Sequence, residues 1–320
     1  MFLSAATVLI ASLIATGVVW YFLRRHAILD HPNARSSHAS PVPRGGGLAV
    51  IAILVCAWAY VAPMAMQLEL WVVLLAAVLL ATVSWIDDLR SLSPITRLLA
   101  QAAGVLPALI WFADSGLVFQ GLLPPPLDLA ASALAWLWFV NLFNFMDGID
   151  AISAVEAISI GGGVALIASL APASGLDPAL GLTLAAAAIG FLVWNWPPAK
   201  IFLGDVGSVP LGFLLGWLLL KLAASGYWAP ALILPLYYLA DATITLVLRA
   251  ARREPVWQAH RQHYYQRAVQ RGRSHGRVSA AIAAANLLLA ALAVLSLTQP
   301  WIALGLGGLV TAILLVWLSR

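Results

Sequence analysis

The sequence predicts an all-α membrane protein, built as a polytopic transmembrane helical bundle of about 11 spans. Its 320 residues are 62% hydrophobic and only 9% charged, whereas about a quarter of the residues of a soluble protein are charged. The apolar residues form blocks of about 17 to 23, the length that a helix needs to cross a ~30 Å hydrocarbon core. An outer-membrane barrel would instead show alternating segments of about 10 residues. We expect one integral membrane domain over residues 1–320.

The apolar blocks can be placed along the chain from start to end. They cover residues 2–23, 46–63, 69–86, 97–113, 128–145, 152–172, 178–195, 207–224, 228–248, 278–297 and 300–318. The first block has no basic segment before it and no small-residue cleavage site after it, so we expect a retained helix rather than a signal peptide. Cys56 is the single cysteine, which excludes a disulfide or a cysteine metal site within one chain.

The basic residues predict the orientation of the bundle. The polar segments that follow odd-numbered blocks are 24–45, 87–96, 146–151, 196–206, 249–277 and Arg320. With Arg97 counted at the mouth of its block, they hold sixteen of the 17 Lys and Arg, and only Lys221 lies on the other side. By the positive-inside rule these segments are cytoplasmic, with the N-terminus on the opposite, periplasmic side and the C-terminus in the cytoplasm. The net charge of +4 is then a topology signal, and we predict no nucleic-acid partner.

Two adjacent carboxylates, Asp87 and Asp88, end the third block at the membrane boundary. Neighbouring like charges repel each other, and burying them costs several kcal/mol unless a cation offsets them. The pair therefore indicates a divalent metal ion or a nearby arginine, with a solvated helix end as the alternative.

Amides and carboxylates recur every three residues where the fifth block ends, at Asn141, Asn144, Asp147 and Asp150. They would share one face if the helix continued, while Gly148 indicates a local break or a close approach to a ligand. The alternative is a polar seam between two helices, held by interhelical hydrogen bonds.

The connection before the eighth block places two glycines around one acid, as Gly204-Asp205-Val206-Gly207. The glycines leave room for backbone N–H groups and a carboxylate to approach a phosphate-bound ion. A helix starting near Ser208 would point the positive end of its dipole at an anion. The alternative is that Asp205 is an ordinary helix N-cap.

The longest basic segment, residues 249–277, contains eight arginines together with His260, His263 and His275. His260 and His263 are three residues apart, with Arg261 between them. A zinc site would need further ligands at matching spacing, so we predict anion recognition. A loop lying on anionic lipid headgroups is the alternative, and it explains the charge but not the paired histidines.

The first polar loop carries three more groups suited to a diphosphate or a lipid phosphate, Arg35, His38 and Arg44. It ends in the glycine run Gly45-Gly46-Gly47, and a turn-rich linker is the alternative. Across all these loops the acidic and amide ligands are hard oxygens, which favour magnesium over a thiolate-bound or imidazole-bound metal. Magnesium typically binds through one or two carboxylates plus substrate phosphates.

Five motifs in a fixed order resemble those of the polyprenyl-phosphate N-acetylhexosamine-1-phosphate transferases. They are Asp30 to Gly47, Asp87-Asp88 with Leu92-Ser93-Pro94, Asn141 to Asp150, Phe202 to Ser208, and His260 to His263. This superfamily includes phospho-N-acetylmuramoyl-pentapeptide transferase and the initiating transferases of O-antigen synthesis. The run His-Arg-Gln-His at 260–263 departs from the His-rich run of the peptidoglycan enzyme, which favours the O-antigen or a related glycan branch.

The resemblance implies a reaction and its partners. N-acetylhexosamine-1-phosphate would move from a UDP-sugar, UDP-N-acetylglucosamine or a 6-deoxy relative, to undecaprenyl phosphate in the membrane lipid, and UMP would be released. Mg²⁺, with Mn²⁺ as a substitute, would be the cofactor at a cytoplasmic active site. The product would start lipid-linked glycan synthesis for lipopolysaccharide or the cell wall. The oligomeric state stays open, with a homodimer among the alternatives.

The resemblance also implies roles for individual residues. Asp205 would be the leading magnesium ligand, together with Asp147, and Asp87 and Asp88 would lie near the reacting phosphates. Asn144 and Asp150 would help to hold the nucleotide and the metal. His260 and His263 would contact the diphosphate or the sugar. The remaining candidates for substrate binding are Asn141, Arg35, His38, Arg44, Arg97 and Arg261.

Two other classes of protein are compatible with a helical bundle. A transporter would carry its coupling groups near the bilayer midplane, where only Asp241 and Glu156 are expected here. A structural scaffold would tolerate the change of Asp87, Asp147 or Asp205 to Asn. The clustering of ionisable residues in loops on one side favours the enzyme.

Overall fold

The computed structural model of the chain is helical over almost all of its described length. It describes residues 2–30, 41–61, 67–110, 116–255 and 260–320, so that the candidates Arg35 and His38 lie outside the described residues. The helices are α1 (Phe2–Arg25), α2 (Gly47–Val61), α3 (Gln67–Arg90), α4 (Pro94–Ile110), α5 (Pro125–Phe145), α6 (Ile152–Leu170), η3 (Pro172–Ser174), α7 (Pro178–Asn195), α8 (Asp205–Ala224), α9 (Trp228–Ile233), α10 (Leu236–Ala251), α11 (Tyr264–Gln270), α12 (His275–Leu295) and α13 (Pro300–Ser319). The predicted all-α fold is confirmed.

Within the described residues, eight helices are long and apolar enough to cross a membrane: α1, α3, α5, α6, α7, α8, α12 and α13. The apolar helices α2 and α4 are shorter. The block predicted at 228–248 is divided into α9 and α10 at Pro235, because proline has no N–H to continue the hydrogen-bond ladder and its ring crowds the preceding turn. The protein is thus a multi-pass membrane protein, while the count of eleven spans and the sides of the two termini stay predictions.

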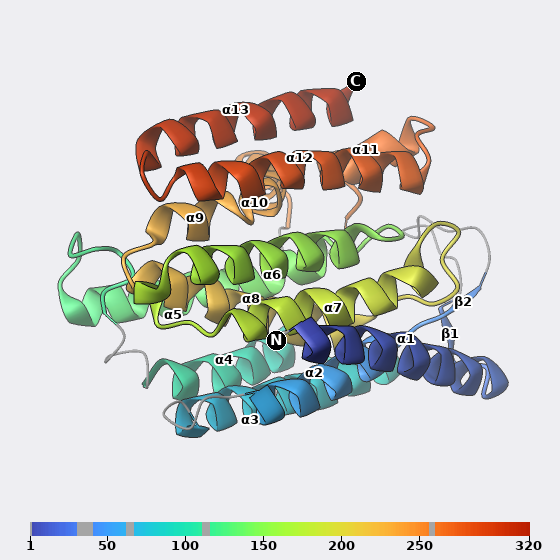
Figure 1. The fold of residues 1–320 in the computed structure, drawn as a ribbon. Coiled ribbons are helices and arrows are strands. Elements are labelled where there is room, and N and C mark those ends of the chain that lie inside the picture. The colour runs from blue at the N-terminus through green and yellow to red at the C-terminus, as the bar shows by residue number, and fades with distance from the viewer. Residues whose placement is uncertain (1, 31–40, 62–66, 111–115, 256–259) are drawn as a thin grey trace.

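The long helices lie side by side, and short elements lie toward both ends of the bundle (Figure 1). In that view α11, the C-terminus and the short strands lie toward the right, and α9 lies toward the left. Helix α8 forms the centre, since it packs against α3 and α5 and is buried along nearly its whole length. Large side chains fill this core, among them Trp58, Trp136 and Trp217.

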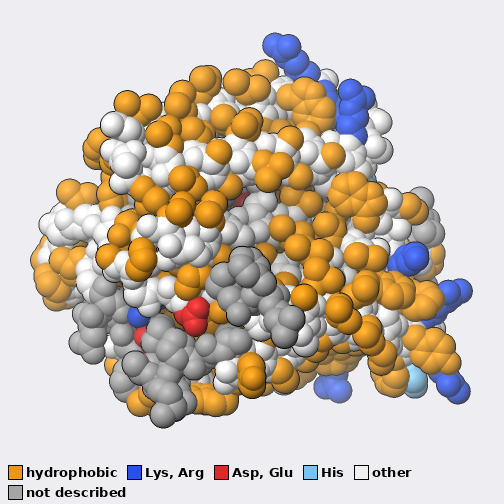
Figure 2. Space-filling model, viewed as in Figure 1, with side chains coloured by type: hydrophobic (Ala, Val, Ile, Leu, Met, Phe, Trp, Pro, Cys, Tyr) orange, Lys and Arg blue, Asp and Glu red, His pale blue; other side chains and the backbone are white. Residues whose placement is uncertain are grey.

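The surface has the composition expected of a protein in lipid. Figure 2 shows hydrophobic side chains over most of one face, with most of the visible Lys and Arg toward the end that carries α11. Large apolar side chains such as Leu287 and Ile313 are exposed on α12 and α13. Water would disfavour so much exposed apolar area, whereas hydrocarbon does not.

A backbone clamp joins the start of α2 to the start of α8. Strand β1 (Leu29–Asp30) pairs with β2 (Val42–Pro43), and the chain beyond β2 then bonds to the segment before α8. The Phe202 N–H donates to the Pro43 carbonyl at 2.8 Å, and the Gly47 N–H donates to the Leu203 carbonyl at 2.9 Å. A Cβ atom on Gly47 would lie 2.2 Å from the Gly207 Cα, so only glycine permits this approach.

Candidate active site

The clamp brings one arginine between two acids from different helices. One guanidinium nitrogen of Arg44, Nη2, lies 2.9 Å from Asp88 Oδ1 and 2.7 Å from Asp205 Oδ1. Asp88 comes from the last turn of α3 and Asp205 from the first turn of α8. The sequence prediction that a cation must offset the Asp87-Asp88 pair is confirmed, with arginine as the cation at Asp88.

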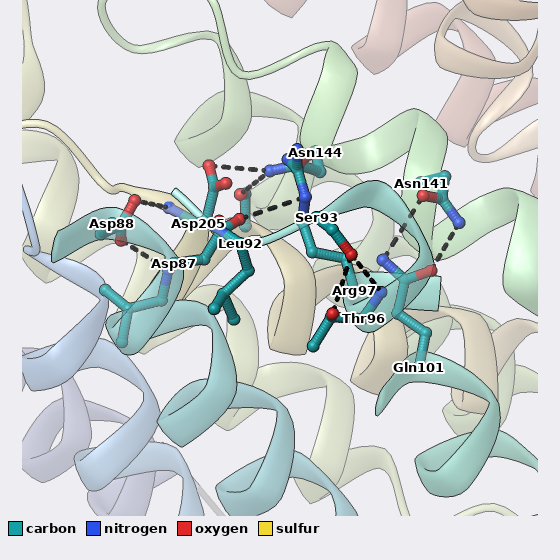
Figure 3. A network of polar contacts seen from close by, with 12 residues as sticks. Asp87, Asp88, Leu92, Ser93, Thr96, Arg97, Gln101, Asn141, Asn144 and Asp205 are labelled. Atoms are coloured by element: carbon teal, nitrogen blue, oxygen red, sulfur yellow. Dashed lines mark hydrogen bonds and ion pairs between the residues drawn. The ribbon is translucent and has the colours of Figure 1, made fainter. Parts of the chain in front are cut away.

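Asp88 also holds the N-terminus of α8. Its Oδ1 accepts the Asp205 N–H at 3.1 Å and its Oδ2 accepts the Val206 N–H at 3.0 Å (Figure 3). A carboxylate is well suited to this place because the first N–H groups of a helix lack partners and its dipole attracts an anion. Burial alone would lower the pKa of Arg44, but the carboxylates of Asp205 and Asp88 raise it above its usual value, so Arg44 is a permanent cation here.

Asp205 lies at the centre of the polar cluster. Its Oδ1 accepts a hydrogen bond from Asn144 Nδ2 at 3.1 Å as well as the Arg44 contact, and the same amide nitrogen donates to Ser208 Oγ at 2.9 Å. The N-cap of α8 is Gly204, with a φ of 75°, and no side chain caps the helix there. The alternative in which Asp205 is an ordinary N-cap is therefore excluded. The helix also begins at Asp205 rather than near Ser208.

Asp87 lies on the other side of the same cluster. Its Oδ1 accepts the Leu92 N–H at 2.5 Å, and its Oδ2 lies 3.4 Å from Arg97 Nε. Its carboxyl group also neighbours that of Asp205. The cluster thus unites six of the predicted residues at one end of the bundle: Asp87, Asp88, Asp205 and Asn144, with Arg44 and Arg97 as counter-charges.

The predicted stripe of amides and carboxylates is divided. Helix α5 ends at Phe145, so only Asn141 and Asn144 lie on it. The Asn141 Nδ2 atom donates to Gln101 Oε1 at 2.7 Å and to the Leu137 carbonyl at 2.7 Å. Asn141 thus belongs to a polar seam between α4 and α5, the alternative that the sequence left open, and its role in substrate binding stays a prediction.

Asp147 and Asp150 lie in the turn between α5 and α6 and face different partners. Asp147 interacts with Ser153 and with the charges of Asp205 and Arg44, and burial raises the pKa of its carboxyl group to about 7. Asp150 lies 3.2 Å from His275 Nδ1 and accepts the Ala199 N–H at 3.0 Å. Asp147 therefore borders the cluster, whereas Asp150 ties the turn to α12 and to the segment before α8.

The two loop histidines are next to each other but differ in exposure. Their ring centroids are 4.8 Å apart. His263 is buried and its Nδ1 lies 3.2 Å from Asp241 Oδ1, whereas His260 is half-buried. Burial, together with the nearby His263 and Arg249, lowers the pKa of His260 to about 4, so His260 is neutral near pH 7. The candidate Arg261 is also partly buried in this loop.

Sequence reasoning assigned no site role to four residues that the structure places in these networks. They are Ser208, Gln101, Asp241 and His275. Gln101 follows Arg97 by one helical turn, which was a usable signal. The partners of Asp241 and His275 are remote in sequence, and no local pattern reveals them.

The carboxylates of the cluster are compatible with a magnesium ion whose other ligands come from substrate phosphates. Among the residues that the structure describes, no three His, Cys, Asp or Glu side chains are close enough to hold a metal by themselves. Two carboxylate oxygens, from Asp88 and Asp205, nevertheless converge on one cationic nitrogen. Magnesium needs only one or two carboxylates when substrate phosphates supply further ligands, so this donor set is suitable.

The fold and the site together define a membrane-embedded protein with an acidic, arginine-balanced cluster at one end of its helices. The chain belongs to glycosyl transferase family 4, whose family model matches residues 70–223. The matched part includes α3 to α8 and with them Asp87, Asp88, Asn144 and Asp205.

Curated relatives extend the similarity beyond the family model. The chain is 31% identical over 267 residues to a phospho-N-acetylmuramoyl-pentapeptide-transferase of Synechococcus sp. (strain CC9311), with 75% of this chain and 71% of that protein covered. It is 28% identical over 285 residues to a probable undecaprenyl-phosphate N-acetylglucosaminyl 1-phosphate transferase of Bacillus subtilis (strain 168), covering 83% and 77%. It is 29% identical over 320 residues to the decaprenyl-phosphate N-acetylglucosaminephosphotransferase of Mycobacterium tuberculosis (strain ATCC 25618 / H37Rv), covering 85% and 76%. The resemblance found in the sequence is confirmed, and these relatives give the transporter alternative no support.

Proposed function

We propose that this protein transfers N-acetylhexosamine-1-phosphate from a UDP-sugar to undecaprenyl phosphate and releases UMP, at the cytoplasmic face of a bacterial inner membrane. N-acetylglucosamine is the favoured sugar because two of the relatives named above carry it in their names. The product would start a lipid-linked glycan, in the O-antigen pathway or a related one.

The convergence of Asp87, Asp88, Asn144 and Arg44 on Asp205 carries this proposal. Such a cluster at the end of a lipid-exposed bundle suits a reaction between a water-soluble diphosphate and a lipid phosphate. The two substrates can then meet at the interface without either having to leave its own phase.

The chemistry needs positioning and charge neutralisation more than a strong base. A phosphate monoester has a second pKa of about 6, so most of the acceptor is already dianionic at pH 7. One of its oxygens forms a bond to the β-phosphorus while the bond from that phosphorus to the bridging oxygen breaks, and UMP leaves with the bridging oxygen. Arg44 and Arg97 would stabilise the charge that spreads over the phosphate oxygens.

The carboxylates of the cluster are better suited to positioning other groups than to nucleophilic attack on phosphorus. Both oxygens of Asp88 accept N–H groups of α8, and both oxygens of Asp87 are engaged with Leu92 and Arg97. These contacts support direct transfer between the two phosphates rather than a phospho-enzyme. A labelled phosphate trapped on Asp87 or Asp88 during turnover would contradict direct transfer.

Magnesium, with manganese as a substitute, would be held by Asp205 with help from Asp147, and when bound it would neutralise charge on the substrate phosphates. Asn144 would orient Asp205 through its 3.1 Å hydrogen bond. Arg44 already occupies the space between Asp88 and Asp205, so it would have to share these oxygens with the ion.

The test is UMP release by the purified protein given undecaprenyl phosphate, Mg²⁺ and a panel of UDP-N-acetylhexosamines. We expect release that needs both lipid and metal and that is lost in Asp205→Asn. Asp177→Asn is a matched carboxylate-to-amide control, because Asp177 caps α7 with a 2.8 Å bond to the Ala179 N–H and asparagine caps a helix equally well. No release with any donor, or equal release by Asp205→Asn, would overturn the proposal.

A further inference from the structure

Asp241, on α10, is a fully buried acid surrounded by donors from α10 and from the start of α11. Its Oδ1 lies 3.2 Å from His263 Nδ1 and accepts the Tyr264 N–H at 3.0 Å and the Thr245 hydroxyl at 3.3 Å. Its Oδ2 accepts the Tyr237 hydroxyl at 3.2 Å and the Tyr265 N–H at 3.3 Å. With four N–H and O–H donors at its two oxygens, the carboxyl group of Asp241 acts as an acceptor.

The contacts of Asp241 fix the hydrogen-bonding role of the His263 ring. Because Asp241 Oδ1 already accepts the Tyr264 N–H and the Thr245 hydroxyl, it acts as an acceptor toward His263 Nδ1 as well, which places a proton on that nitrogen. The ring is also fixed from both sides, since its centroid lies 4.8 Å from that of His260 and 5.8 Å from that of Tyr265. The orientation of the His263 ring is thus fixed by its neighbours, and the ring is buried.

The His263 ring in turn supports His260, which is the more exposed of the two. The Gln262 N–H donates to His260 Nδ1 at 3.3 Å, so the neutral His260 ring carries its proton on Nε2 and presents a donor. The charged and titratable groups that influence His260 are His263, Arg249, Glu254 and Asp241. A neutral N–H donor beside arginines suits a phosphate oxygen.

Helix α11 fixes this histidine pair relative to the acidic cluster. The Tyr265 hydroxyl donates to the Phe145 carbonyl at 3.1 Å, just before the turn that contains Asp147. A Cβ atom on Gly148 would lie 2.2 Å from the Tyr265 hydroxyl and 3.2 Å from Gln266 Nε2. Because Asp241 accepts the first N–H groups of α11, it determines where this helix meets the turn.

We propose that Asp241 is a positioning residue for the transfer reaction, which acts through His263 to present the Nε2–H of His260 to a phosphate oxygen of the nucleotide diphosphate. This inference rests on the proposed function. Asp241 itself does not touch substrate, because it is fully buried beneath the His263 ring. Its contribution depends on the acceptor oxygen that it places at His263 Nδ1 and not only on its volume.

A double-mutant cycle in the full-length protein tests this inference. We expect Asp241→Asn and His263→Gln each to lower kcat for UMP release about 10- to 100-fold, as changes of residues that orient a site do. The double variant should be no slower than the slower single variant, because both changes interrupt one chain of contacts. Rates that multiply in the double variant, or an Asp241→Asn variant with the kcat and KM of the wild type, would overturn it.

Tyr237→Phe is the matched control for the loss of a buried hydrogen bond. It removes one donor to Asp241 Oδ2 and leaves the His263 contact in place, so kcat should stay near that of the wild type. A loss as large as that of Asp241→Asn would instead show that packing around Asp241, and not its hold on His263, sets the rate.

A spectroscopic measurement on the wild type covers the case in which the variants fail to fold. In ¹⁵N-histidine-labelled protein, with His263 assigned by elimination from single variants of the other five histidines, His263 should show a proton on Nδ1, and a proton on Nε2 alone would overturn the inference. This readout also separates the two proposals. A wild type that releases no UMP with any donor contradicts the proposed function, while the spectrum still decides the role of Asp241.

Discussion

Replacing Arg44 with methionine removes the cation shared by Asp88 and Asp205 while keeping a long side chain in the clamp. Loss of one partner from a buried ion pair costs about 3 to 5 kcal/mol. The Asp88 side chain is 3% exposed and that of Asp205 is 19% exposed, but Arg44 itself is 34% exposed. Asp88 also keeps its two N–H donors from α8. We therefore expect a loss near the low end, about 3 kcal/mol.

Thermal unfolding followed by tryptophan fluorescence measures this loss, since the chain has 14 tryptophans. With an unfolding entropy of about 2.1 cal/mol/K per residue, about 3 kcal/mol corresponds to a midpoint about 4 to 5 °C lower. Mg²⁺ should recover most of the loss in Arg44→Met, because a ligand at 100 times its dissociation constant adds about 2.7 kcal/mol. The wild type should gain less, since there the ion competes with Arg44.

The control is Arg44→Lys, which keeps a positive charge and should lose less stability than Arg44→Met. A midpoint for Arg44→Met equal to that of the wild type would refute the idea that the two acids depend on this cation. An equal Mg²⁺ response in both proteins would refute the shared position of the ion and the guanidinium group.

Two further predictions concern the amide residues of α5 and the loop histidine. Asn144→Leu should lower kcat at least tenfold because Asp205 loses a donor at 3.1 Å. Asn141→Leu should leave kcat nearly unchanged but cost about 1 to 3 kcal/mol of stability, because Gln101 loses its partner. Reversed effects of the two variants in the UMP assay and in thermal unfolding would contradict this assignment. The pKa of His260 falls from 6.5 in the unfolded chain to about 4 in the folded protein. Because the unfolded chain binds the proton more readily, the stability present above pH 6.5 should be lost as the pH falls toward 4. His260→Gln should reduce this difference between the midpoints at pH 7.5 and 4.5, and an unchanged difference would show that other groups cause it.

The sequence predicted the presence of helices better than their ends. Apolar blocks of spanning length identify membrane helices because lipid leaves no other way to satisfy the backbone. The end of α5 at Phe145 was not visible, although Gly148 indicated a break nearby. The three-residue spacing from Asn141 to Asp150 predicts one shared face only if the helix continues; the helix ends before Asp147, and the structure gives these residues separate partners.

For the candidate site, the sequence identified the acids and the kind of partner that they need. Two adjacent carboxylates at a membrane boundary require a cation, and Arg44 and Arg97 meet that requirement. Which arginine contacts which acid depends on the clamp between the starts of α2 and α8, a pairing of segments about 160 positions apart in the chain. The contact between Asp241 and His263 is likewise a tertiary contact that no local sequence pattern reveals.

The clamp has a consequence for the order in which the chain can assemble in the membrane. When α3 enters the bilayer, Asp88 has neither its α8 partners nor a fixed Arg44, because both depend on a segment that the ribosome makes more than a hundred residues later. A helix that ends in an unpaired carboxylate is costly to keep in lipid. The nascent protein should therefore hold this end of α3 at the water interface until α8 arrives. The segment from Phe202 to Gly207 then supplies the missing partners of Asp88, so its loss should impair biogenesis as well as catalysis.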